Sequence, residues 1–132
     1  MYELVEHTAD IRIRVRAASR EELFADALRG LMAVVDPHGL TAGAAGAEIS
    51  IDAPDTTVLL VDFLNEALSR AHADREIYTK VTFGRLTDTN LTARLEGVRV
   101  EGFGEDVKAV TYHEAEVREH AGEWSTLLVL DI

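Results

Sequence analysis

The sequence predicts an α+β fold, a two-layer domain in which a mostly antiparallel β-sheet carries two helices on one face. Two segments before residue 75 have apolar residues at helical spacing, and from residue 77 onward the apolar period changes to two. Short polar connections join these later segments, which favours antiparallel pairing of neighbours. The length of 132 residues matches one ordinary domain, so we expect a single domain over residues 1–132.

The first predicted strand covers residues 11–17, where apolar and polar residues alternate strictly. This alternation is the pattern of a strand with one buried face. The polar face carries Arg12, Arg14 and Arg16. We expect these arginines to face solvent, and contact with a partner protein is the alternative.

Two amphipathic helices are predicted, at about residues 20–35 and 56–73. Ser19 and Glu22 match a capping box ahead of the first helix, and Pro54-Asp55 opens the second. In both segments the apolar residues recur at helical spacing. Their apolar stripes are therefore expected to form core.

A flexible loop is predicted between the helices, because Pro37, Gly39 and the Gly- and Ala-rich run 41–46 break the pattern. A short strand at residues 47–53 should follow. Gly102-Phe103-Gly104 is interpreted as a β-turn between strands, since no helix follows that could bind phosphate. The later predicted strands are residues 77–83, 91–95, 98–100, 107–117 and 124–130.

The charge is strongly acidic, with 13 Lys and Arg against 24 Asp and Glu and a formal net charge of −11. Such a field repels a phosphate backbone, so direct nucleic-acid binding is not expected, whereas basic protein surfaces are attracted. No window approaches the roughly 20 apolar residues of a membrane span. The N-terminal residues do not resemble a secretory signal, so we expect a cytoplasmic protein.

Most common catalytic and metal-binding patterns are missing from the sequence. Without cysteine, the chain can form neither disulfides nor thiolate sites. The five histidines, at positions 7, 38, 72, 113 and 120, lack the i, i+4 spacing of a helical zinc site. No Gly-x-Ser-x-Gly elbow is present. Hydrolysis by paired carboxylates remains open, because carboxylates are abundant and their spatial pairing cannot be deduced from sequence.

The last two residues are unusual for a chain end. Asp131 follows a strongly apolar predicted strand, and the α-carboxylate of Ile132 is one residue away. Two anions held this close repel each other unless a cation or hydrogen-bond donors join them. A solvated, frayed terminus is the alternative. The apolar strand favours an anchored one.

Segments along the whole chain together resemble the archease family, although each segment alone is weak evidence. They occur in the same order as in that family and run from the opening motif to the final residue. The segments are His7-Thr8-Ala9-Asp10, Phe24-Ala25-Asp26-Ala27-Leu28, Asp62-Phe63-Leu64-Asn65-Glu66, Val107-Lys108-Ala109-Val110-Thr111-Tyr112-His113 and Asp131-Ile132.

The resemblance implies a protein that catalyses no reaction itself and activates an RtcB-type RNA ligase. Family members promote guanylylation of this GTP- and metal-dependent ligase of tRNA splicing and RNA repair, which permits repeated turnover. The resemblance also implies a divalent metal site formed by Asp10, Asp131 and the free carboxylate of Ile132. Oxygen ligands suit calcium, and magnesium or manganese are alternatives.

Lys108 matches a basic position that the family keeps beside the metal-bearing end, which implies contact with the partner or its nucleotide. An exposed strand lysine is the alternative.

Two other functions of the protein stay open. One is a chaperone for another tRNA-processing enzyme, such as a tRNA methyltransferase, and the other is a stand-alone metal-dependent hydrolase. The sequence leaves the oligomeric state open.

Overall fold

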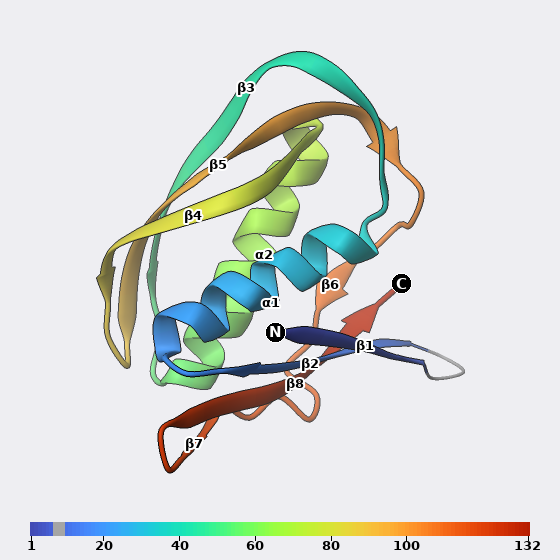
Figure 1. Cartoon of the computed structure of the whole chain (residues 1–132). Helices are drawn as coiled ribbons and strands as arrows, with labels where there is room; N and C mark the ends of the chain where they lie inside the picture. Colours follow the sequence, from blue (N-terminus) through green and yellow to red (C-terminus); the bar gives the residue numbers. More distant parts are fainter. Residues whose placement is uncertain (7–9) are drawn as a thin grey trace.

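The computed structural model describes residues 1–6 and 10–132, and its antiparallel strands form two sheets with both helices between them (Figure 1). In the larger sheet the strand order is β1-β2-β8-β6, and β7 pairs with β8 outside this path. The bounds are β1 Tyr2–Glu6, β2 Ile11–Ala17, β6 Ala109–Val110, β7 Arg118–His120 and β8 Glu123–Asp131.

The smaller sheet has the order β3-β5-β4 and covers the helices from the other side (Figure 1). The antiparallel strands and two helices confirm the predicted α+β class. The predicted two-layer arrangement with a single sheet is wrong, because the strands form two sheets and the helices lie between them. The bounds are α1 Arg20–Val34, α2 Thr56–Asp74, β3 Pro37–Asp52, β4 Glu76–Leu86 and β5 Asn90–Phe103. No helix in the described part of the chain is long and apolar enough to cross a membrane.

Both helices begin where the predicted caps place them. The Ser19 hydroxyl accepts a hydrogen bond from the Glu22 amide at 3.1 Å, and the Asp55 carboxylate accepts one from the Val58 amide at 2.9 Å. Glu22 reaches back to the amide of Ala18 at 3.4 Å. These contacts satisfy amide groups that a helix cannot pair internally.

The core lies between the two sheets and consists mainly of the predicted helical stripes. Phe24 of α1, Phe63 of α2 and Phe83 of β4 form an aromatic cluster with ring centroids 5.8–6.2 Å apart. From the larger sheet, Ile13 and Leu128 are fully buried. Each such large apolar side chain contributes about 1.5–3 kcal/mol through burial.

The predicted loop from Pro37 to residue 46 is wrong, because β3 begins at Pro37, runs through this segment and pairs with β5 over nearly its whole length. The register shifts between Thr41 and Ala44, so the Gly- and Ala-rich run is accommodated as an irregularity within the strand. Local composition favoured a loop. The backbone hydrogen bonds supplied by β5 outweigh that preference, which is a tertiary effect.

The predicted strands 91–95 and 98–100 are one strand, β5, which continues through Gly97. An added Cβ at Gly97 would lie 1.8 Å from the carbonyl oxygen of Ile77, so glycine permits close approach of β4 there. β5 also includes Gly102 and Phe103, and the chain bends only at Gly104. The expected turn at these residues is therefore wrong for its first two positions.

The predicted strand 107–117 is mostly irregular, and only Ala109–Val110 form a strand. Val117 lies outside the strands, and its amide donates to the Thr57 hydroxyl at 2.9 Å. Strand β1 was not predicted. It pairs with β2 in a register that places Leu4 beside Ile13.

Candidate functional site

The register of β2 and β8 brings the first and last motifs of the chain together. Ile11 pairs with Leu130 in antiparallel orientation, so Asp10 and Asp131, the next residues along each strand, lie beside each other. The side chain of Asp10 is 21% exposed, and Asp131 is exposed. The strand register therefore places two aspartates at one end of the central strand of the larger sheet. We call this end the β8 tip, defined by Asp10, Lys108, Asp131 and Ile132.

The pairing of β6 with β8 adds Lys108 to the same end. Ala109 pairs with Asp131, and the Lys108 amide donates to the Asp131 carbonyl oxygen at 2.8 Å. Lys108 itself is exposed, and Ile132 is 41% exposed. The four residues that the resemblance singled out thus come from three neighbouring strands and lie together.

Arg12 connects the tip to the loop that follows β6. Its Nε lies 3.2 Å from the Asp10 carboxylate, and its Nη1 forms an ion pair with Glu114. Partial desolvation lowers the pKa of Arg12, but the hydrogen bond to Asp10 and the charges of Glu114 and Asp10 raise it overall. A permanent positive charge thus offsets part of the negative charge at the β8 tip.

The short strand β6 is fixed by a side chain of α2. Asn65 donates from Nδ2 to the Val110 carbonyl oxygen and accepts at Oδ1 from the Val110 amide, both at 2.8 Å. β6 pairs with β8 on its other side. Asn65 therefore takes the place of a neighbouring strand and holds the segment that carries Lys108.

A second contact joins the same two motifs. The Tyr112 hydroxyl donates to the Asp62 carboxylate, and this hydrogen bond raises the pKa of Tyr112, with smaller contributions from burial and the Asp62 charge. The Thr111 amide and hydroxyl both donate to the Val129 carbonyl oxygen, at 2.9 and 3.0 Å. The residues after β6 are thus tied to α2 on one side and to β8 on the other.

Sequence reasoning did not assign roles to Asn65, Asp62 or Tyr112. It expected Arg12 to face solvent, whereas the Arg12 side chain is only 18% exposed and pairs with Asp10 and Glu114. Asn65, Asp62 and Tyr112 lie in motifs that carried the family resemblance, and that was the available signal. Nothing in the sequence shows that Asn65 binds the Val110 backbone, because 45 residues separate them.

Within residues 1–6 and 10–132, no three His, Cys, Asp or Glu residues form a group that could hold a metal ion. Asp10 and Asp131 are two such residues, and the third predicted ligand is a main-chain carboxylate. The segment His7-Thr8-Ala9 of the opening motif lies outside the described residues.

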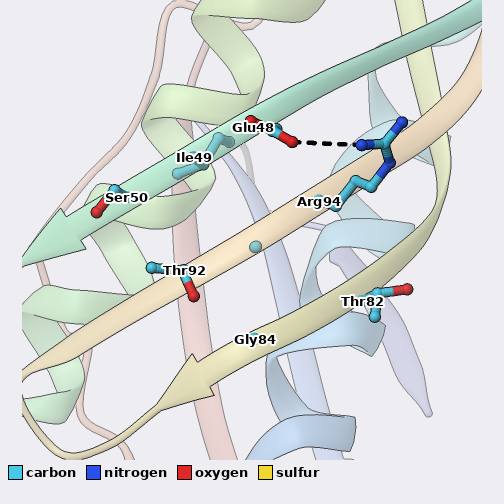
Figure 2. A pocket seen from close by; sticks show the side chains of 8 residues that line it. Glu48, Ile49, Ser50, Thr82, Gly84, Thr92 and Arg94 are labelled. Atoms are coloured by element: carbon cyan, nitrogen blue, oxygen red, sulfur yellow. Dashed lines mark hydrogen bonds and ion pairs between the residues drawn. The ribbon is translucent and has the colours of Figure 1, made fainter.

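A separate hollow of about 450 Å³ lies on the outer face of the smaller sheet. Figure 2 shows the Glu48–Arg94 ion pair, at 3.3 Å, beside the hydroxyls of Ser50 and Thr92. Gly84 lacks a side chain here, which leaves the space open. No residue of the β8 tip lines this hollow. It is therefore a different surface from the candidate site.

Comparison with known proteins gives a consistent match. Residues 2–132 match the model of the Archease protein family (MTH1598/TM1083). The chain is 30% identical over 139 residues to Protein archease of Methanosarcina barkeri, covering 99% of this chain and 95% of that protein. It is 28% identical over 144 residues to Protein archease of Methanopyrus kandleri, with 99% of each covered.

Two solved structures share the fold. The solution structure of Methanobacterium thermoautotrophicum protein 1598 has a TM-score of 0.73 at 25% identity, covering 99% of this chain and 98% of that one. The crystal structure of a Thermotoga maritima protein, described as an archease and possible chaperone, has a TM-score of 0.71 at 23% identity. It covers 100% of this chain and 98% of that one.

Proposed function

Because the chain belongs to the archease family, we propose that it is a cytoplasmic, non-catalytic activator of an RtcB-type RNA ligase. In this proposal it binds a divalent cation and promotes guanylylation of the ligase, which permits multiple turnover in tRNA splicing and RNA repair. The observation that supports it best is the meeting of Asp10, Asp131 and Lys108 at the β8 tip.

The donor set fits a hard divalent cation. Asp10 and Asp131 lie beside each other, and the α-carboxylate of Ile132 would add a third anionic group. Neighbouring carboxylates repel each other, and a cation between them removes that cost. Oxygen donors suit calcium, with magnesium or manganese as alternatives. The cation would supply positive charge at the tip, while Arg12 orients Asp10 through its hydrogen bond.

Lys108 is the residue proposed to contact the ligase or its nucleotide. Its backbone is fixed by the Asp131 carbonyl oxygen, and Asn65 fixes β6 two residues further along the chain. The exposed ammonium group of Lys108 is a suitable partner for a phosphate. A fixed backbone with an exposed charge reduces the entropy lost on binding.

The proposed mechanism is a shift in the conformational equilibrium of the ligase. The tip would bind the guanylylation-competent conformation more tightly than others, and only such a difference in affinity can promote the step. The net charge of −11 favours association with a basic surface of an RNA-handling enzyme. In this proposal the ligase, and not this chain, contacts the RNA.

The proposal is tested by following transfer of labelled GMP from GTP to the ligase from the same organism. The wild-type chain should raise the guanylylation rate, and Lys108→Ala should remove most of that increase. Lys80→Ala is the matched control, because Lys80 is also exposed and pairs with Glu96 on the other sheet. An equal rate with and without the wild-type chain would refute the proposal.

A further inference from the structure

A charged hollow of about 280 Å³ lies on the outer face of the larger sheet, away from the helices. Its charged lining residues are Arg14, Arg16, Glu114, Glu116 and Arg118. The buried side chains of β2, which pack on the helices, point to the opposite face of the sheet. The hollow is therefore a surface feature that the fold leaves uncovered.

Two arginines that line this hollow, Arg14 and Arg16, differ in their contacts from the other arginines around it. Arg118 forms an ion pair with Glu116 at 2.9 Å, and Arg12 is held by Asp10 and Glu114. Among the residues that the structure describes, Arg14 and Arg16 have neither an ion pair nor a side-chain hydrogen bond. In a chain with a net charge of −11, two neighbouring unpaired guanidinium groups indicate a surface suited to an external anion.

The spacing of Arg14 and Arg16 indicates which kind of anion fits this surface. Arg14 and Arg16 are two residues apart on one strand, so they share a face and their Cα atoms lie about 6.6 Å apart. An extended polypeptide presents its own alternate side chains at the same period. We propose that this hollow binds an extended acidic segment of a partner protein, whose carboxylates at alternate positions pair with Arg14 and Arg16.

A polypeptide fits this lining better than a nucleic acid does. Glu114 and Glu116 line the same hollow, and a phosphate backbone would be repelled by them and has no cation to offer in exchange. A polypeptide can place a lysine opposite these glutamates and keep carboxylates opposite the arginines. The segment is therefore acidic at alternate positions with a flanking basic residue.

Leu127 and Ser125 provide the floor on which such a segment would lie. They pair in register with Arg14 and Arg16, respectively, and both are half-buried. Apolar and hydroxyl groups beneath paired charges reduce competition from water, which strengthens guanidinium–carboxylate contacts. The inference does not depend on the ligase proposal, because Arg14 and Arg16 have no hydrogen bond or ion pair to the described residues of the β8 tip.

The test is an NMR titration of the full chain with a synthetic peptide that has glutamate at every second position and one flanking lysine. Amide shift changes should concentrate on residues 13–17, 118 and 124–128. The double variant Arg14→Ser/Arg16→Ser should weaken binding at least about tenfold. The matched control, Arg85→Ser/Arg94→Ser, removes the same charge from the other sheet and should bind like wild type.

Three results of the peptide titration would overturn the inference. They are no binding of the peptide, binding that the control variant weakens equally, and shift changes that concentrate outside the arginine face. An oligouridylate run in parallel separates the two classes of anion. If it binds through Arg14 and Arg16 more tightly than the peptide, the surface is a nucleic-acid site. The backbone spectra of both variants report directly whether each is folded.

Discussion

Asn65 and Val110 are joined by two hydrogen bonds of 2.8 Å, in which one side-chain amide satisfies both backbone groups of a strand residue. This contact links α2 to the edge of β6 that does not pair with β8. Lys108 directly precedes β6 in the chain. The position of the candidate partner contact therefore depends on a helix residue that lies 45 positions before Val110 in sequence.

Replacing Asn65 with Leu should destabilise the fold by about 1–3 kcal/mol, because the backbone amide and carbonyl group of Val110 lose their partner. Urea unfolding measures this loss, and hydrogen exchange should show faster exchange of the Val110 amide. Tyr112→Phe removes the neighbouring contact to Asp62 and should leave that amide protected. Unchanged exchange in Asn65→Leu would mean that β8 alone holds β6.

Gly97→Ala should be strongly destabilising, since its Cβ would lie 1.8 Å from the Ile77 carbonyl oxygen. Forcing β4 and β5 apart there should cost about 1–3 kcal/mol or more. Gly102→Ala is the matched control on the same strand, because nothing lies within 4 Å of its added Cβ. Thermal unfolding followed by circular dichroism compares the two. Equal stabilities would contradict the close approach of these strands.

The surroundings of the Tyr78 and Tyr112 phenol groups predict that the folded protein loses stability at alkaline pH. Burial, followed by the hydrogen bond to Glu76, raises the pKa of Tyr78, and the hydrogen bond to Asp62 raises that of Tyr112. A raised folded pKa favours folding below the unfolded value of about 10, and this contribution is lost as pH rises through the folded value.

Tyrosinate absorbance and urea unfolding across this alkaline range measure the effect. Tyr78→Phe and Tyr112→Phe should each show a shallower fall in the free energy of unfolding than wild type does. A fall of the same steepness in all three proteins would contradict the assigned environments of these two phenols.

Asp10→Asn and Asp131→Asn should each weaken calcium binding by at least about tenfold, because each removes a negative charge from a hard-cation site. Isothermal titration with calcium and manganese measures the affinities. Glu123→Gln is the control, since Glu123 is exposed at the opposite end of the same strand. If both aspartate variants bound metal like wild type, the site would lie elsewhere.

Elements specified by local patterns were predicted well. Ile11–Ala17 has the predicted bounds, and both helices begin at the predicted residue, because alternation and caps act within a few residues. The Gly- and Ala-rich run in β3 is a strand because β5 pairs with it. Most of residues 107–117 is irregular, and the Val117 amide there donates to the Thr57 hydroxyl instead of to a neighbouring strand.

The residues of the candidate site came from family resemblance, while their arrangement comes from strand register. Asp10 and Asp131 are 121 positions apart in sequence, and no local pattern shows that β2 and β8 are neighbours. The link from Arg12 to Glu114 was also not predicted, because it requires the path of the loop after β6. Metal binding, the ligase partner and the role of Lys108 stay predictions.

The central claim is tested most directly by counting ligated products per ligase molecule, with GTP and divalent metal present and the ligase limiting. The wild-type chain should allow repeated turnover. The Ile132→Val variant should do so too, because it keeps the α-carboxylate of residue 132. A chain extended by a few residues beyond Ile132 should bind calcium weakly and give little stimulation, because the carboxylate becomes a neutral amide carbonyl. A ligase whose turnover number is unchanged by wild-type chain would contradict the account.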